Sequence, residues 1–157
     1  QITCELFPEI APIGVANFVG LARGRRPFLE GGSWIKGRRF YDGLTFHRVI
    51  DDFVAQGGVA QGNGFGGPGY EFVNEIATET HSPGTLAYAN AGPDTNGSQF
   101  YVVAEGPADF LDGDYTIFGR CEPVSVVQAI TETPTNAQDK PLTPVHMLQV
   151  SITRCAP

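Results

Sequence analysis

The sequence lacks any apolar run that approaches the roughly 20 residues of a membrane-spanning helix. Charged residues are also few, at 17% of 157 positions, and the net charge is −7. A broad basic surface is therefore missing, which argues against nucleic acid as a partner. No signal peptide is recognisable in the sequence. Because it starts at Gln1 rather than Met, we expect a mature or trimmed product whose missing start could have carried an address.

Residues that hold metals are scarce and scattered. None of the three cysteines belongs to a C-x-x-C pair, and the three histidines lie far apart in the sequence. We therefore predict no zinc site, no other metal and no cofactor. The cysteines allow either one disulfide with one free thiol or three buried thiols, and the count alone does not fix the redox compartment. These six residues are Cys4, Cys121, Cys155, His47, His81 and His146.

Turn-forming residues are abundant, with 20 glycines and 12 prolines, and they separate short apolar runs. This pattern indicates a sheet-rich chain, and the length suits a single domain over residues 1–157. Apolar and polar residues alternate at 2–6 and again at 148–152, as half-buried strands require. Further strands are predicted at 45–50, 53–56, 85–89, 99–103 and 116–121.

Two segments have helical periodicity. Val15, Phe18, Val19 and Ala22 follow the i, i+3, i+4, i+7 spacing, with Pro12 in the first turn and Gly24 at the exit. The second predicted helix begins at Pro123 and carries an apolar stripe of Val126, Val127 and Ile130. Both stripes are expected to face the core.

The long connections at 23–39, 57–69 and 91–98 are rich in glycine and polar residues, and such loops are often functional. Gly62, Gly64 and Gly67 match G-x-G-x-x-G, but Pro68 and Gly69 follow where a dinucleotide site needs a helix. Nucleotide binding stays a distant alternative to a simple loop. The basic residues clustered at 23–39 are interpreted as a solvated loop.

Other catalytic patterns are incomplete. The acidic residues at 109–114 do not follow the spacing of a calcium loop, so a turn is expected there. Ser98 has no G-x-S-x-G around it and no histidine–aspartate pair placed to activate it. The cysteines have no basic neighbourhood beyond Arg120 and Arg154, so no cysteine nucleophile is expected.

The most informative stretch is YDGLTFHRVIDDFVAQGG at residues 41–58. Two further blocks are TLAYANAGPDTNGSQFYV at 85–102 and FLDGDYTIFGR at 110–120. With FPEIAPIGVANFVGLA at 7–22 and PLTPVHMLQVSITR at 141–154, these ordered blocks resemble the cyclophilin family over nearly the whole chain. The resemblance implies a peptidyl-prolyl cis-trans isomerase that acts on proline-containing peptides and unfolded protein chains and assists protein folding.

The resemblance also implies the site. Arg48 matches the family's catalytic arginine, and Val54 and Tyr101 replace a usual methionine and phenylalanine. The other matched positions line the substrate groove or hold the peptide through the backbone. The expected substrate-binding residues are Phe53, Val54, Gln56, Ala89, Asn90, Ala91, Gln99, Tyr101, Phe110, Leu111 and Tyr115. His47 is expected to point to the opposite face of the strand from Arg48, as a structural core histidine.

Two aromatic positions depart from animal cyclophilins, which usually carry tryptophan at Phe110 and histidine at Tyr115. The residues present here resemble bacterial members. Catalysis should survive because both remain aromatic, whereas cyclosporin binding is expected to be weak because the indole donor is missing. The sole tryptophan, Trp34, lies too far along the sequence to substitute.

The implied fold is mainly β: a closed eight-stranded antiparallel barrel capped by two α-helices. Residues 2–7 match the family's second strand, so its first strand is missing from this sequence. Either upstream residues complete the barrel or one edge is open, which would favour aggregation. The family's strand order also puts Cys4 near Cys121. A disulfide there is a hypothesis that favours an exported or periplasmic protein over a cytoplasmic one, and we expect a monomer.

A second functional hypothesis keeps the same fold. The groove could serve a binding or scaffold module without important turnover, although intact Arg48, Phe53 and Gln56 argue against this alternative. A turnover assay separates the two.

Overall fold

The computed structural model describes residues 1–62 and 64–154. These residues form eight strands, two α-helices and one short 3-10 helix. In chain order the elements are β1 (Thr3–Leu6), α1 (Pro12–Ala22), β2 (Phe28–Glu30), β3 (Ser33–Ile35), β4 (Phe46–Ile50), β5 (Val54–Gly57), β6 (Thr85–Tyr88), β7 (Phe100–Val103), η1 (Asp109–Leu111), β8 (Ile117–Glu122) and α2 (Val124–Thr131). None of the helices described is both long and apolar enough to cross a bilayer.

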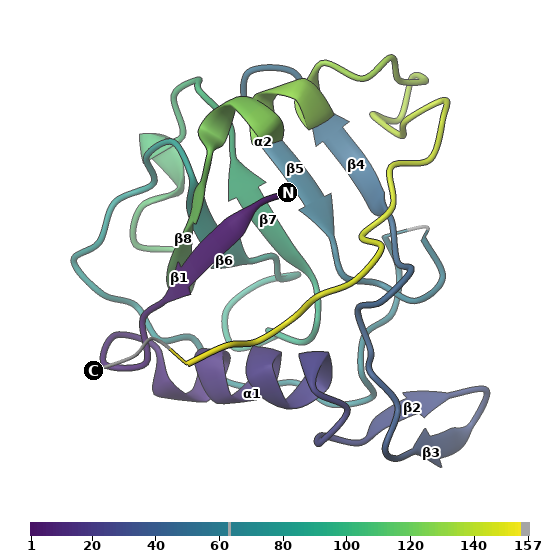
Figure 1. Cartoon of the computed structure of the whole chain (residues 1–157). Coiled ribbons are helices and arrows are strands. Elements are labelled where there is room, and N and C mark those ends of the chain that lie inside the picture. Colours follow the sequence, from purple (N-terminus) through teal and green to yellow (C-terminus); the bar gives the residue numbers. More distant parts are fainter. Residues whose placement is uncertain (63, 155–157) are drawn as a thin grey trace.

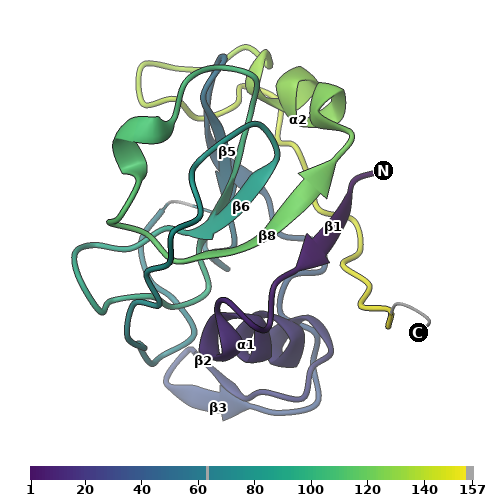
Figure 2. The same ribbon diagram turned by 90° about the vertical axis from the view of Figure 1, so that its left-hand side faces the viewer.

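Six strands form one antiparallel sheet in the order β1-β8-β6-β7-β5-β4. Figures 1 and 2 show α1 at one end of this curved sheet and α2 at the other. Each of the six strands begins and ends within one residue of a segment predicted from alternation or short apolar runs. The prediction of a mainly β chain with two helices is confirmed.

Aromatic side chains fill the interior between α1 and the sheet. Phe18 of α1 contacts the rings of Tyr41, Phe100 and Phe118, with centroids 4.8, 5.6 and 5.3 Å apart. Tyr88 stacks on Phe118 at 4.4 Å. Side chains of this size bury large apolar areas and gain further from edge and stacked contacts, so this cluster fixes the helix against the sheet.

Helix α1 begins and ends where the sequence indicates. Pro12 occupies the first turn, where its missing N–H costs nothing, and Gly24 takes a φ of 69° just beyond the end. The free N–H groups of Ile13 and Gly14 donate to the Glu75 carboxylate at 3.0 and 2.8 Å. A negative side chain at a helix N-terminus is stabilising, so a residue far along the sequence completes the helix.

Residues 23–39, predicted as a loop, instead contain the hairpin of β2 and β3. Gly31 and Gly32 connect the strands, and both have positive φ, at 56° and 80°. Two-residue hairpin turns of type I′ have positive φ at both positions, which glycine adopts without strain. The Gly-Gly pair was therefore a usable signal. Phe28 anchors the hairpin in the core, with its ring 4.8 Å from that of Phe40.

The strand predicted at 148–152 is wrong, because these residues belong to no strand or ladder. Side chains take the place of a neighbouring strand. Arg39 donates to the carbonyl of Val150, Arg23 donates to that of Ile152 at 3.1 Å, and Asp42 accepts the N–H of Val150 at 2.8 Å. Two residues of the predicted solvated loop thus hold the C-terminal segment.

Cys4 and Cys121 lie directly opposite each other in the β1–β8 ladder, and their sulfurs are joined in a disulfide. The hypothesis drawn from the family's strand order is confirmed for this pair. The bond spans 117 positions of sequence and ties an edge strand to the sheet. The third cysteine, Cys155, lies outside the described residues.

Candidate functional site

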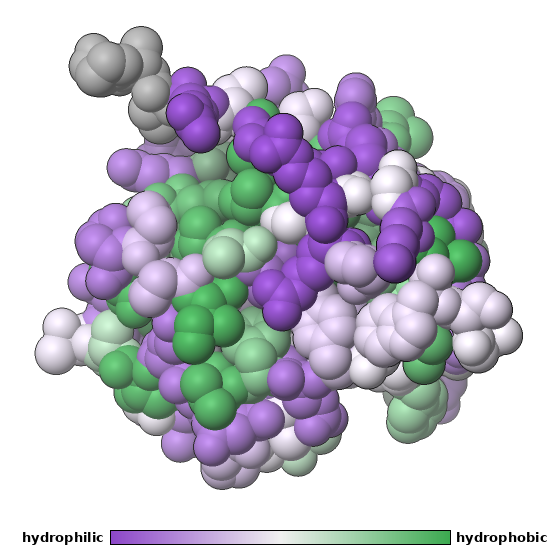
Figure 3. All heavy atoms as spheres, turned by 90° about the horizontal axis from the view of Figure 1, so that it is seen from below, coloured by the Kyte–Doolittle hydropathy of each residue, from purple (hydrophilic) through white to green (hydrophobic). Residues whose placement is uncertain are grey.

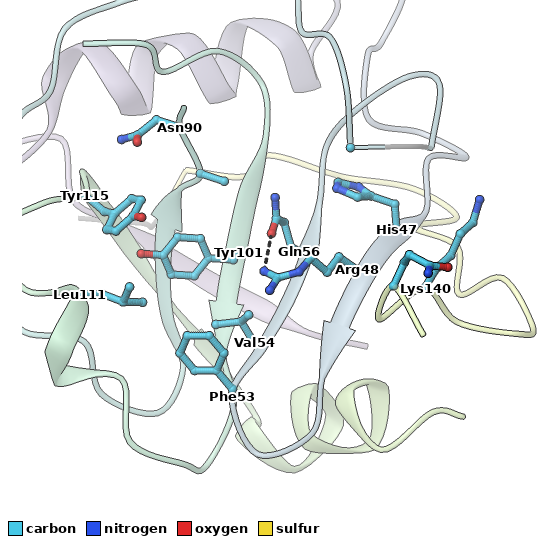
Figure 4. Close-up of a pocket in the computed structure, with 13 residues that line it drawn as sticks. His47, Arg48, Phe53, Val54, Gln56, Asn90, Tyr101, Leu111, Tyr115 and Lys140 are labelled. Carbon is cyan, nitrogen blue, oxygen red and sulfur yellow. Dashed lines mark hydrogen bonds between the residues drawn. The ribbon is translucent and has the colours of Figure 1, made fainter. Parts of the chain in front are cut away.

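A pocket with a volume of about 450 Å³ opens on one face of the sheet (Figure 4). Arg48 comes from β4, Gln56 from β5 and Tyr101 from β7. The ladders pair Arg48 with Gln56, and Gln56 with Tyr101. Residues directly opposite in an antiparallel sheet project to the same face, so the strand register brings these three side chains together.

Apolar side chains form the rest of the pocket floor and wall. Val54 and Tyr101 are 3% and 5% exposed, and they pack in a small second core cluster beneath the pocket. Phe53, Leu111 and Tyr115 pack against that cluster from the side. The result is a hollow that can hold a compact apolar ring next to one cationic group.

The guanidinium of Arg48 is held from two sides. Its Nη1 donates to Gln56 Oε1 at 3.4 Å, the contact dashed in Figure 4, and its Nε lies 3.5 Å from a carboxylate oxygen of Asp139. Gln56 in turn donates to Gln99 Oε1 at 3.2 Å, and Gln99 donates to the carbonyls of Gly64 and Gly66. A guanidinium has five N–H donors, so these two contacts leave donors for a ligand.

Tyr101 is fixed from behind by the buried side chain of His81, which is itself held by the partly exposed Asp112. Its hydroxyl lies 2.7 Å from Nε2 of His81, and Nδ1 of His81 lies 2.8 Å from Asp112 Oδ1. The same Asp112 oxygen accepts the backbone N–H of His81 at 2.7 Å. These two bonds from His81, the backbone bond first, lower the pKa of Asp112. Burial raises the pKa of Tyr101, whose hydroxyl is therefore neutral under ordinary conditions.

His47 does not behave as the predicted core histidine in every respect. It is 6% exposed, but the ladder shifts register beside it, and its ring borders the pocket. Neither ring nitrogen has a hydrogen-bond partner among the described residues. Burial first, then the charges of Arg48 and Lys140, lower its pKa to about 4. The ring is therefore neutral near pH 7.

Most of the predicted site residues meet in this pocket. Arg48 and eight of the predicted binding residues line it: Phe53, Val54, Gln56, Ala89, Asn90, Tyr101, Leu111 and Tyr115. Ala91 and Gln99 instead line an adjoining cavity of about 680 Å³. Phe110 lies outside both cavities, 66% exposed, with its ring 5.3 Å from that of Phe53.

Sequence reasoning missed several neighbours of the pocket. His47, Gly64, Gln138 and Lys140 also line it, and His81 supports it from beneath. His81 lies 20 residues from Tyr101 and 31 from Asp112, and no local pattern marks it. Only the pairing of distant strands reveals the contact.

The alternative motifs have structural roles. Gly62, Gly64 and Gly67 belong to no helix or strand, and no helix follows them at 68–84. Ser98 donates its hydroxyl to the Gly58 carbonyl at 2.7 Å. The acidic segment forms η1 and a turn. Among residues 1–62 and 64–154, no group of three or more histidine, cysteine or acidic side chains could hold a metal ion.

Comparisons with known proteins agree with this geometry. The family model for cyclophilin type peptidyl-prolyl cis-trans isomerases matches residues 1–152. Peptidyl-prolyl cis-trans isomerase A of Mycobacterium tuberculosis is 44% identical, and the alignment covers 97% of this chain and 86% of that protein. Peptidyl-prolyl cis-trans isomerase B of Streptomyces anulatus is 47% identical, with 97% and 90% covered.

A solved structure has the same fold. It is the cyclophilin type peptidyl-prolyl cis-trans isomerase of Cryptosporidium parvum, determined in the presence of the dipeptide Ala-Pro. Its TM-score is 0.83 at 27% identity, and the match covers 98% of this chain and 93% of that one. Family model, relatives and fold all point the same way, and the chain belongs to the cyclophilin-type peptidyl-prolyl cis-trans isomerases.

Proposed function

We propose that the chain catalyses rotation about X-Pro peptide bonds in the pocket of Arg48, and that Arg48 is its one indispensable catalytic side chain. The observation that carries this proposal is the strand register that sets Arg48, Gln56 and Tyr101 on one face above an apolar floor. The arrangement offers one fixed cation and a ring-sized hollow.

The chemistry needs no more than this. The X-Pro bond has a rotation barrier of roughly 18–20 kcal/mol, and uncatalysed rotation takes about 10–100 s. Thousands of turnovers per second would require lowering the barrier by about 7 kcal/mol, at 1.36 kcal/mol per factor of ten. No bond is made or broken and no proton moves, so neither a nucleophile nor an acid–base pair is needed.

Arg48 would act on the twisted state. When the bond twists, amide resonance is lost and the proline nitrogen regains its lone pair. A fixed donor aimed at that nitrogen binds the twisted state better than either planar state, which is differential stabilisation of the transition state. The contacts to Gln56 and Asp139 would hold the guanidinium in place. The group stays charged at any ordinary pH.

The remaining pocket residues would bind and orient the substrate. Phe53, Val54, Tyr101 and Leu111 would enclose the proline ring and exclude water, with Tyr115 on the far wall and Phe110 at the rim beside Phe53. The backbone of Ala89, Asn90 and Ala91 would keep the peptide in register while one side of the bond rotates, with Gln99 as a polar neighbour. Proline-containing peptides and unfolded chains are the substrates we propose, with assistance to protein folding as the role.

We also infer that the chain is one domain with the eight-stranded barrel fold of its family, from which the first strand is missing in this sequence, and that its six-stranded sheet is closed by the C-terminal segment. Residues 43–46 and 145–147 exchange backbone hydrogen bonds, such as Met147 N–H to Leu44 at 2.8 Å and Phe46 N–H to Val145 at 3.0 Å. The segment 145–152 also shares a groove with β1. These contacts support closure between the two edges of the sheet. A monomer and weak cyclosporin binding complete the proposal.

The test is protease-coupled isomerisation of a short X-Pro peptide. We expect fast turnover that Arg48→Ala abolishes and that Arg48→Lys restores poorly, because lysine is a point charge without the guanidinium fork. Arg120→Ala is the matched control, since this exposed arginine of β8 lies away from the pocket. Turnover near wild type in folded Arg48→Ala would refute the role of Arg48. No turnover in the folded wild-type protein would favour a binding module.

A further inference from the structure

A notch lies between the β2–β3 hairpin and Tyr70, outside both cavities described above. Its volume is about 370 Å³, and its lining residues are Arg26, Pro27, Trp34, Lys36 and Tyr70. Trp34 is the only tryptophan of the chain and is 53% exposed. The notch thus combines two aromatic rings and a proline ring with two cations, and no acidic residue lines it.

Two walls of the notch are already fixed. The guanidinium of Arg26 lies over the Tyr70 ring, 4.7 Å from its centroid. The Tyr70 hydroxyl donates to Asn17 Oδ1 at 2.8 Å, and Asn17 is fully buried in α1. The Leu29 N–H donates to the Pro68 carbonyl at 2.9 Å, which attaches the hairpin to the neighbouring loop. Little ordering is therefore required when a ligand enters.

Most cations near the notch are already engaged within the molecule, and Lys36 is not. Residues 23–39 hold six of the ten basic residues of a chain whose net charge is −7. Arg23 and Arg39 bind the C-terminal segment, and Arg38 is paired with Glu30 at 2.5 Å. Lys36 has no hydrogen bond or ion pair to any residue in the described part of the chain, so its ammonium is free for a partner. Figure 3, which shows the molecule from below, has strongly hydrophilic residues beside paler and apolar ones on this face.

The notch continues the substrate groove. The pocket of Arg48 and the adjoining cavity share Gln56, Gly64, Ala89 and Asn90. The adjoining cavity in turn shares Tyr70 with the notch. A polypeptide whose proline sits beside Arg48 can follow these three depressions in turn, with Tyr70 as the border of the last.

We propose that the notch is a third subsite for the client chain, which takes an acidic residue next to an aromatic one, several residues from the proline. The carboxylate pairs with Lys36, and the aromatic ring packs on Trp34 and Pro27. This inference rests on the proposed isomerisation only for the position of the proline. Exposed ion pairs and aromatic contacts are individually modest, and together they give roughly a tenfold gain in affinity.

The experiment uses peptides with one Ala-Pro core and an Asp-Phe-Asp module joined through Gly-Ser spacers of several lengths, on either side of the proline. Matched peptides carry Lys-Phe-Lys instead. Emission from Trp34 reports binding at the notch directly, and protease-coupled isomerisation reports turnover of the same peptides. We expect the acidic module, on one side and at a suitable spacer length, to lower KM about tenfold and to shift the emission. Salt should weaken both effects.

Lys36→Glu is the decisive variant, because Lys36 contacts neither the pocket of Arg48 nor the core. It should abolish the advantage of the acidic module and leave turnover of the short Ala-Pro peptide unchanged. Equal KM values for acidic, basic and short peptides would overturn the subsite, as would an acidic preference that survives Lys36→Glu. If no peptide is turned over, the isomerase proposal fails, while the emission titration still tests the notch separately.

Discussion

Removal of the Cys4–Cys121 disulfide should destabilise the protein strongly without touching the site. The bond joins residues 117 positions apart, so it closes a loop that takes up most of the chain. Loop-closure entropy for that length corresponds to about 5 kcal/mol of unfolding free energy, through restriction of the unfolded state. For a domain of this size, such a loss lowers the melting temperature by roughly 10–20 °C. Turnover at 25 °C should not change, because neither cysteine lines the pocket.

The assay is urea unfolding with and without reductant, in a Cys155→Ser background that removes the third thiol. Intact mass should rise by about 2 Da on reduction, which establishes that one bond was broken. The double variant Cys4→Ser/Cys121→Ser is the control, because its midpoint of unfolding should be the same with and without reductant. If the mass rises but the midpoint of unfolding stays unchanged, the entropic reasoning is wrong. If the mass does not rise, the bond itself is absent.

Three further outcomes follow from contacts in and around the sheet. Tyr101→Phe should lower the unfolding free energy by about 1–3 kcal/mol, because the buried Nε2 of His81 loses its hydrogen-bond partner. Replacement of His81 by Phe in the same variant should recover part of this loss. If Tyr101→Phe alone leaves urea unfolding unchanged, the contact contributes nothing to stability. The pKa of His47 is lowered to about 4, so the unfolded state binds more protons between pH 6.5 and 4. Stability should therefore fall by up to about 3 kcal/mol as the pH drops through this range, and His47→Gln should remove that part of a pH series of unfolding curves. Gly84→Ala should also be destabilising, because the φ of Gly84 is 85° and a Cβ there would lie 2.5 Å from the Cys121 carbonyl oxygen. Thermal unfolding measures the loss as a lower melting temperature. An unchanged melting temperature would show that the turn relaxes.

The sequence predicts well those elements that depend on local patterns. The six sheet strands and both helices follow from alternation, helical spacing and the positions of Pro12, Gly24 and Pro123. The C-terminal segment alternates equally well but forms no ladder. Its partners are the side chains of Arg23 and Arg39, and a binary pattern contains no information about such contacts.

Some residues of the site could likewise be predicted from the sequence, and others could not. Arg48, Gln56 and Tyr101 could be placed because the family resemblance fixes their positions and the strand register then aligns them. The role of His81 could not be predicted, because its two partners lie far apart in the sequence. Asp112 follows η1 and Tyr101 lies in β7, and only the tertiary fold brings them together. For Phe110 the resemblance predicted a pocket residue that the structure does not place in the pocket. The aligned position is aromatic, but the ring lies at the rim, beside Phe53.

The basic hairpin segment also makes the charge distribution of the molecule strongly uneven. Residues 23–39 hold six cations and one carboxylate, a charge of +5, while the rest of the chain holds four cations and sixteen carboxylates, a charge of −12. An approaching acidic chain is attracted by the hairpin segment and repelled by the net charge of the rest of the chain. Its encounter is thus oriented before contact, and the association rate of such a chain should fall with salt even though both molecules are net anions.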